Sequence, residues 1–152
     1  MVIAFFGHSS FVVKKEYEQR VEEFLEKTVG DHHADMYLGG YGGFDSFAYD
    51  CCKKYKQTHP NVSLVFITPY ITVEYQKNHL NQLKSLYDLI IYPEIENRLP
   101  RFAIVYRNKW IVENADYIVV GIDHVYGGAY KAYCHALNIK KPVINIMEKH
   151  LE

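Results

Sequence analysis

The sequence predicts an α/β protein, a single doubly wound, Rossmann-like domain with a mainly parallel sheet spanning residues 1–152. Short, unbroken apolar runs recur along the chain, as in strands that are buried on both faces. Amphipathic segments with helical periodicity separate these runs. This alternation of strand and helix favours parallel strands joined by crossover helices. The length suits one domain and is too short for two ordinary ones.

The first half of the chain predicts three strands and two helices. The expected strands are Val2–Phe6, Met36–Leu38 and Val62–Ile67. A helix over Lys15–Val29 has apolar residues three and four positions apart and ends at Gly30. The next helix shows the clearest helical periodicity, in Phe44, Phe47, Ala48, Cys51, Cys52 and Tyr55.

The second half predicts three more strands, at Asp88–Tyr92, Tyr117–Ile122 and Pro142–Ile146. The polar stretch Glu74–Ser85 is either helical or irregular. Apolar residues lie nearly all round a helix over Arg101–Asn114, which is therefore expected to be largely buried. The helix over Ala129–Leu137 has a single apolar face.

Composition excludes several classes of protein. The net charge is −1, so a nucleic-acid partner is not expected, because such proteins rely on a basic excess. No apolar run approaches the roughly 20 residues that span a bilayer, so no membrane association is expected. Three cysteines give no disulfide framework, which favours the cytoplasm. The 14 tyrosines could stack on bases or simply be half-buried.

In a doubly wound sheet, ligands bind beyond the carboxyl ends of the strands. The segments that follow the predicted strands are Gly7–Ser10, Gly39–Asp45, Thr68–Tyr70 and Asp123–Gly128. Two of these segments are rich in glycine, and each opens a helix. A helix that begins at such a loop directs unpaired N–H groups and a positive dipole end at its ligand. The two loops therefore predict a phosphate-containing ligand.

Three polar residues near these loops have two interpretations each. His8 could bind a phosphate or cap a turn, and Asp45 could accept hydrogen bonds from a ribose or cap its helix. Arg107, with Asn108 beside it, is a charge on an apolar helix. Either an anionic ligand or a structural salt bridge would give Arg107 its partner.

Other motifs are absent or weak. The chain contains no Walker motif and no Gly-x-Ser-x-Gly, and Gly40-Tyr41-Gly42 lacks the third glycine of the dinucleotide fingerprint. The cluster Asp31-His32-His33-Asp35 lies in a turn without metal-ligand spacing and is interpreted as a solvated turn. No metal and no cofactor are predicted.

The order of motifs resembles the SLOG superfamily over essentially the whole chain. The matching segments are Gly39-Gly40-Tyr41-Gly42-Gly43-Phe44-Asp45, the stretch from Arg107 to Asp116, Gly127-Gly128 and Lys141-Pro142-Val143-Ile144. This grouping contains the DNA-processing protein A domain, the LOG proteins and many small bacterial and prophage-borne proteins. The resemblance implies a Rossmann-like fold that binds nucleotides or their derivatives, with the phosphate at the glycine loop.

LOG enzymes hydrolyse the N-glycosidic bond of nucleoside monophosphates, and one motif glutamate of these enzymes is absent here. Arg107 and Gly127-Gly128 match the LOG pattern, whereas Cys134 stands in place of the glutamate, which nucleoside deoxyribosyltransferases also carry. Glycosidic hydrolysis needs a carboxylate near the sugar. The resemblance therefore favours a binding protein or sensor over an enzyme.

The predicted function is binding of a nucleotide-type ligand such as a nucleoside monophosphate or ADP-ribose. The alternative is an N-glycosidase or phosphoribohydrolase that uses Arg107 and an acid such as Asp45, Asp123 or Glu113. By analogy with LOG proteins, a homodimer is expected. The predicted nucleotide-binding residues are Gly7, His8, Ser9, Gly39, Gly40, Gly42, Gly43, Asp45, Arg107, Asn108, Gly127 and Gly128.

Overall fold

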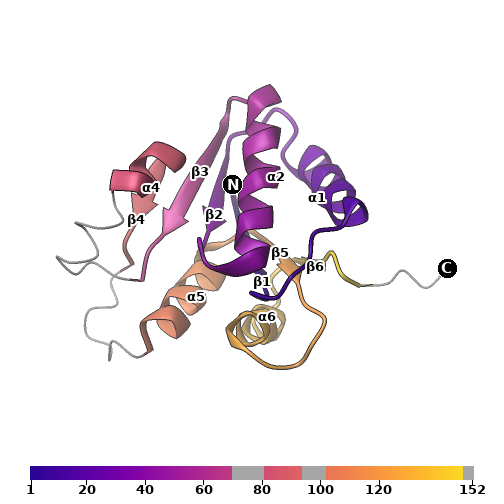
Figure 1. Cartoon of the computed structure of the whole chain (residues 1–152), viewed down its shortest axis with the longest axis vertical. Helices are drawn as coiled ribbons and strands as arrows, with labels where there is room; N and C mark the ends of the chain where they lie inside the picture. The colour runs from indigo at the N-terminus through magenta and orange to yellow at the C-terminus, as the bar shows by residue number, and fades with distance from the viewer. Residues whose placement is uncertain (70–80, 94–101, 149–152) are drawn as a thin grey trace.

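A six-stranded, all-parallel sheet forms the centre of the computed structural model, which describes residues 1–69, 81–93 and 102–148 (Figure 1). The strand order is β4-β3-β2-β1-β5-β6. The strands are β1 (Val2–Gly7), β2 (Ala34–Leu38), β3 (Val62–Ile67), β4 (Leu89–Ile91), β5 (Tyr117–Gly121) and β6 (Val143–Asn145). This topology is the Rossmann-like α/β fold that the sequence predicts. The chain reverses its direction of travel across the sheet between β1 and β5, which makes these neighbours the switch point.

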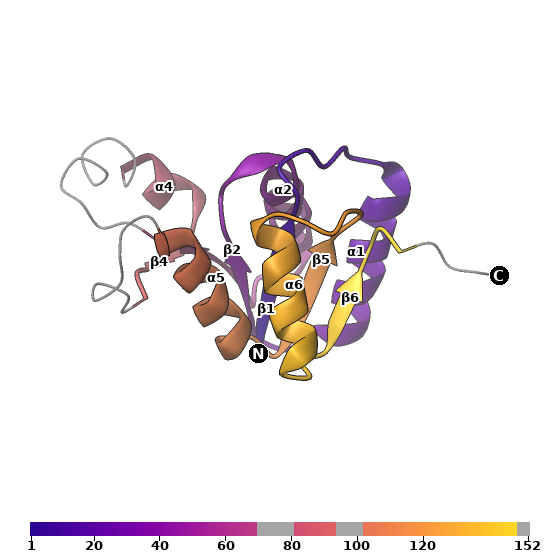
Figure 2. The same cartoon turned by 90° about the horizontal axis from the view of Figure 1, so that it is seen from below.

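Helices cover both faces of the sheet (Figure 2). Helices α1 (Lys15–Thr28) and α2 (Gly42–Thr58) pack on one face, and α5 (Ala103–Asn114) and α6 (Gly128–Asn138) pack on the other. The short helix α4 (Asn81–Leu86) precedes β4. Because β1, β3 and β5 are buried on both sides, their apolar residues form unbroken runs rather than alternating ones. This is the pattern from which the strands were predicted.

Two apolar cores result, one on each face of the sheet. The core under α1 and α2 contains Leu25, Met36 and Phe44, and the core under α5 and α6 contains Ile67 and Ile118. Together they bury most of the apolar side chains of the strands, which is the main stabilising contribution in a domain of this size.

One predicted feature is wrong: α5 is not largely buried. Ile104 and Val105 are 40% and 46% exposed, whereas Ala103, Arg107 and Ile111 face the protein. A helix on the outer layer of a three-layer sandwich buries only one stripe, whatever residues lie on its other sides. The predicted segment Glu74–Ser85 lies partly outside the described residues, and α4 begins at Asn81 within it.

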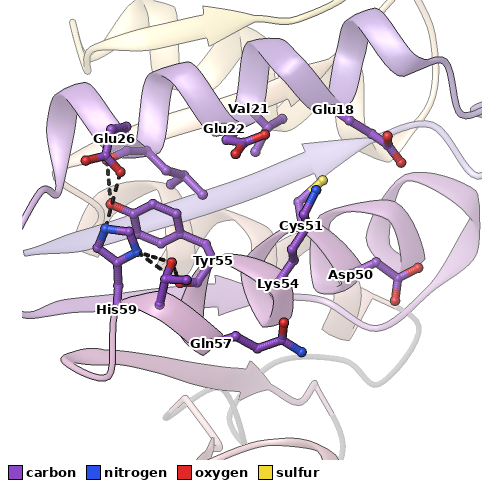
Figure 3. Close-up of a pocket in the computed structure, with 12 residues that line it drawn as sticks. Glu18, Val21, Glu22, Glu26, Asp50, Cys51, Lys54, Tyr55, Gln57 and His59 are labelled. Carbon is purple, nitrogen blue, oxygen red and sulfur yellow. Dashed lines mark hydrogen bonds and ion pairs between the residues drawn. The ribbon is translucent and has the colours of Figure 1, made fainter.

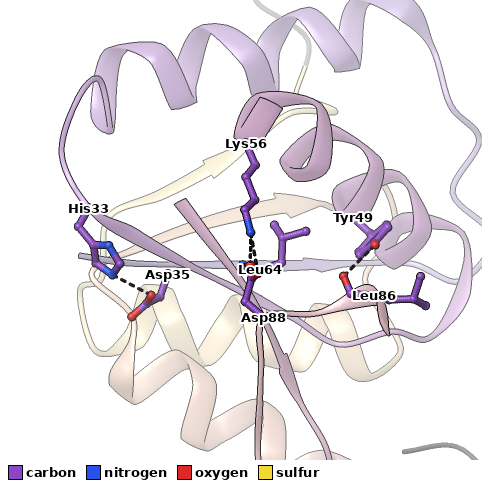
Figure 4. Close-up of polar contacts among 7 residues, drawn as sticks. All are labelled: His33, Asp35, Tyr49, Lys56, Leu64, Leu86 and Asp88. Carbon is purple, nitrogen blue, oxygen red and sulfur yellow. Dashed lines mark hydrogen bonds and ion pairs between the residues drawn. The ribbon is translucent and has the colours of Figure 1, made fainter. Parts of the chain in front are cut away.

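The edge strand β4 is attached to α2 by a polar contact (Figure 4). Lys56 Nζ of α2 lies 2.6 Å from both carboxylate oxygens of Asp88, and Asp88 Oδ2 accepts a hydrogen bond from the Leu64 N–H at 2.7 Å. A short strand at the edge of a sheet has hydrogen-bonding partners on one side only. The Asp88 carboxylate therefore ties this edge to both β3 and α2.

Among the described residues, no helix combines the length and the apolar character that a membrane crossing requires.

Candidate functional site

A cavity of about 390 Å³ lies at the carboxyl edge of the sheet, between the loops that follow β1, β2 and β5 and the start of α5. All strands are parallel, so these loops meet at the same edge. The cavity brings together nine of the predicted residues, namely Gly7, His8, Ser9, Gly39, Asp45, Arg107, Asn108, Gly127 and Gly128. Tyr41, His124 and Tyr126 also line it and were not among the predicted site residues.

Three of the predicted glycines do not line the cavity and serve packing instead. A Cβ at Gly40 would lie 2.5 Å from the Phe66 ring, and one at Gly42 would lie 2.7 Å from Cα of Ser9. At Gly43 it would lie 2.6 Å from the Phe11 carbonyl oxygen. No side chain fits at such distances, so Gly42 and Gly43 allow the loop after β2 to pack against the loop after β1, and Gly40 allows it to pack against Phe66 of β3.

The N-terminus of α2 is already occupied by the protein's own acceptors. The N–H of Gly43 donates to the Ser9 carbonyl at 2.9 Å, and that of Phe44 donates to the His8 carbonyl at 3.3 Å. The N–H of Tyr41 donates to Asp45 Oδ2 at 2.7 Å. Asp45 therefore lies in the first turn of α2 and reaches back to the residue before the helix, so it is not the N-cap residue itself.

The N-terminus of α6 is open. Gly127, with φ of +94°, is the residue before the helix, and a Cβ there would meet no atom within 4 Å. The nearest atom to a Cβ on Gly128 is Asn108 Nδ2, at 3.9 Å. In the described part of the chain no side chain caps this helix. Of the two helices that follow the glycine loops, α6 is thus the one whose positive N-terminal end faces the cavity.

Arg107 holds the cavity wall together. Its Nη1 donates to the carbonyls of Gly39 at 3.1 Å and Ile67 at 3.2 Å, and its Nε and Nη2 donate to Asn108 Oδ1. Its guanidinium lies 5.4 Å from the centre of the Tyr41 ring. The side chain is 5% exposed. Arg107 therefore joins the ends of β2 and β3 to α5.

Asp45 has an altered acidity. Desolvation raises its pKa from 3.8 to about 6, although the hydrogen bond from Tyr41 N–H and the charge of Arg107 act in the opposite direction. A carboxyl group that titrates near neutral pH inside a cavity is a common property of functional sites.

Two histidines face each other at the switch point. The rings of His8 and His124 stack with centroids 3.3 Å apart, and Asp123 Oδ1 lies 2.7 Å from His124 Nδ1. Burial lowers the pKa of His8, as does the neighbouring His124, while Asp123 acts in the opposite direction. His8 and His124 both line the cavity, and a ligand role for His8 stays a prediction.

A second cavity of about 390 Å³ lies between α1 and α2 (Figure 3). Glu26 Oε2 contacts His59 Nε2 at 3.2 Å, and the His59 ring stacks on Tyr55. The carboxylates and the lysine that line this cavity are Glu18, Glu22, Glu26, Asp50 and Lys54. This excess of carboxylates repels a phosphate, so the cavity at the carboxyl edge is the better candidate for an anionic ligand.

Comparison with known proteins gives one curated relative and solved structures of the same fold; no family model matches. UPF0398 protein BH1768 of Halalkalibacterium halodurans is 23% identical over 127 residues, which cover 80% of this chain and 65% of that protein. DNA processing protein A of Helicobacter pylori has a TM-score of 0.60 at 17% identity, covering 94% of this chain and 63% of that one. DNA processing protein A of Streptococcus pneumoniae has a TM-score of 0.63 at 14% identity, with 93% and 48% covered. This chain spans less than two thirds of each of these proteins.

One expectation from the sequence is corrected by these structures. The expectation of no nucleic-acid partner is wrong, because the Helicobacter pylori protein with this fold is described by its single-stranded DNA binding mode. The inference failed because the net charge of a whole chain says little about the potential at one edge of a sheet. The resemblance noted in the sequence is confirmed by the curated relative and by the topology, since the chain has the Rossmann-like fold of the two DNA processing protein A structures.

Proposed function

We propose that the cavity at the carboxyl edge binds a nucleotide unit, with its phosphate at the N-terminus of α6. The observation that carries the proposal is the contrast between the two glycine loops. The amides at the start of α2 are bonded to Ser9 and His8, whereas Gly127 and Gly128 leave open space before α6. An anion there gains the helix dipole and unpaired backbone donors.

Aromatic side chains at the mouth of the same cavity suit a base. Tyr126 is 69% exposed and Tyr41 is 40% exposed, and the ring of Tyr126 lies 4.1 Å from that of His124. Exposed rings beside a phosphate site offer stacking surfaces for a base, each worth about 1–3 kcal/mol. Phosphate and base together define a nucleotide unit.

The test is titration calorimetry with AMP on matched variants at Gly128. Gly128→Asp places a carboxylate where it competes for the N–H groups of α6, and we expect AMP affinity to fall by at least about tenfold. Gly128→Ala is the control, since the space around this residue admits a methyl group. Gly43 is unsuitable, because any side chain there strikes Ser9 and Phe11. Equal AMP affinity in Gly128→Asp and Gly128→Ala would contradict the assignment.

A second candidate is that the nucleotide unit belongs to single-stranded DNA, and the two DNA processing protein A structures favour it. Fluorescence anisotropy with labelled oligothymidylates of increasing length distinguishes the candidates. A DNA-binding protein gains affinity with length over several nucleotides, whereas a site for a free nucleotide does not. Tyr126→Ala should weaken either ligand. If the folded protein binds neither AMP nor oligothymidylate, both candidates are rejected.

A further inference from the structure

His8, Asp123 and His124 form a compact group at the switch point of the sheet. His8 directly follows β1, and Asp123 and His124 follow β5. The two strands pair in parallel with Gly7 opposite Gly121, so the segments beyond them emerge side by side. One potential ligand atom from each of the three side chains lies within 4.8 Å of the other two. Two of the three side chains also line the candidate nucleotide cavity.

His8 is held rigidly and has an unused nitrogen. Its main chain is fixed by hydrogen bonds to Gly121, Phe11 and Phe44. The side chain is 7% exposed, and Nε2 has no hydrogen-bond partner among the residues that the structure describes. Asp123 Oδ1 is 3.8 Å away, beyond hydrogen-bonding distance. A buried polar atom without a partner costs about 1–3 kcal/mol of folding free energy. A bound ligand that bonds to this nitrogen would remove that cost.

We propose that His8, Asp123 and His124 bind a divalent transition metal ion of the Zn²⁺ type. Imidazole nitrogen and carboxylate oxygen are ordinary Zn²⁺ ligands, with bonds of about 2.0–2.2 Å. Both histidines are directed at the same Asp123 oxygen, at 3.8 Å and 2.7 Å. Three protein ligands leave a further coordination position for water or a ligand group.

A histidine–aspartate pair elsewhere on the protein shows what distinguishes the group around His8. His33 Nε2 and Asp35 Oδ1 lie 3.1 Å apart on the surface at the start of β2, with both side chains solvated (Figure 4). That pair has no third ligand, and His33 is 63% exposed. Within residues 1–69, 81–93 and 102–148, the group around His8 is the only one in which three such side chains meet. The sequence does not reveal it, because its members come from two distant loops.

The experiment uses the tag-free full-length chain, treated with EDTA and dialysed, and needs no nucleotide. Calorimetric titration with ZnCl₂ measures affinity and stoichiometry, and Co²⁺ absorption reports the coordination geometry. His124→Gln is the main variant, because His124 is partly exposed and its loss leaves the buried His8 in place. Asp123→Asn is the second variant, and Asp123 is 57% exposed. His33→Gln is the matched control, as a histidine paired with an aspartate outside the group.

We expect one Zn²⁺ per chain whose affinity falls at least about tenfold in both His124→Gln and Asp123→Asn and is unchanged in His33→Gln. Co²⁺ should give the intense visible bands of a four-coordinate nitrogen and oxygen site, and these should disappear in the same two variants. The proposal is overturned if the wild-type chain binds no Zn²⁺. It is also overturned if His124→Gln binds Zn²⁺ as the wild type does. These outcomes are independent of AMP binding, so the metal site and the nucleotide site are tested separately.

Discussion

At the scale of single residues, Asp45 carries a pH dependence that runs opposite to that of most carboxylates. Its pKa is about 6 in the folded protein, against 3.8 for an ordinary aspartate. Between these values the folded state binds more protons than the unfolded state, so this group lowers stability as the pH rises from about 4 to 6. At pH 7 the ionised carboxylate then costs roughly 2–3 kcal/mol.

Asp45→Asn should therefore stabilise the protein at pH 7, since the amide oxygen still accepts the Tyr41 N–H without a buried charge. Urea unfolding followed by the fluorescence of Trp110 measures this. We expect a gain of about 1–3 kcal/mol at pH 7 and little difference from the wild type near pH 4. A variant less stable than the wild type at pH 7 would show that the charge of Asp45 is needed beside Arg107.

For Arg107, the variant to test is one that separates a contribution to folding stability from a contribution to ligand binding. Arg107→Lys cannot reach Gly39, Ile67 and Asn108 together, so carbonyl oxygens lose their donors. We expect a loss of about 2–4 kcal/mol in the free energy of unfolding. Stability within about 0.5 kcal/mol of the wild type, combined with loss of AMP binding, would instead make Arg107 a direct ligand-binding residue.

At the scale of elements, the bond between α2 and β4 should decide how firmly the sheet edge is held. Desolvation would raise the pKa of Asp88, but the bonds from Lys56 and the Leu64 N–H outweigh it and lower the pKa. A carboxylate with a lowered pKa contributes stability that is present above pH 4 and lost as the pH falls below it. The contribution of this partly exposed pair is about 1 kcal/mol.

Asp88→Asn should release this edge while leaving the centre of the sheet intact. Hydrogen exchange at pH 7 should quicken at the Leu64 amide and in Leu89–Ile91 and stay unchanged in β1. Asp35→Asn is the control, because Asp35 lies in β2 and contacts only the exposed His33 in its polar pair (Figure 4). Equal exchange at Leu64 in both variants would contradict the role given to Asp88.

Elements are also where sequence reasoning succeeds best. The six strands were predicted within a few residues, and for β1, β3 and β5 the reason is that strands buried on both faces leave continuous apolar runs. The exposure of α5 was predicted wrongly, because the pattern shows which residues are apolar and not how many sides the neighbours cover. The sequence also pointed to the glycine loop. However, Gly40, Gly42 and Gly43 are glycines because a larger residue would clash with Phe66, Ser9 or Phe11. Such contacts between distant segments leave no local signal.

At the scale of the whole molecule, the charge balance restricts how DNA could be bound. The chain has 17 basic and 18 acidic residues, and the cavity between α1 and α2 is lined by four carboxylates and one lysine (Figure 3). Repulsion from that face leaves the carboxyl edge of the sheet as the candidate surface for a phosphate backbone. Among the described residues that line this cavity, Arg107 is the one lysine or arginine, so few phosphates can be neutralised within it, in contrast to a protein with a long basic groove.

If the nucleotide unit belongs to single-stranded DNA, its affinity should depend only weakly on salt. Each neutralised phosphate contributes about −0.7 to the slope of log K against log salt, so one or two phosphates give a slope of about −0.7 to −1.4. Fluorescence anisotropy with an oligothymidylate between about 50 and 200 mM salt measures this slope. Gly128→Asp should weaken binding at every salt concentration, because its carboxylate occupies the phosphate position at α6. A slope steeper than about −3 would require a basic surface elsewhere and would move the DNA site away from the cavity.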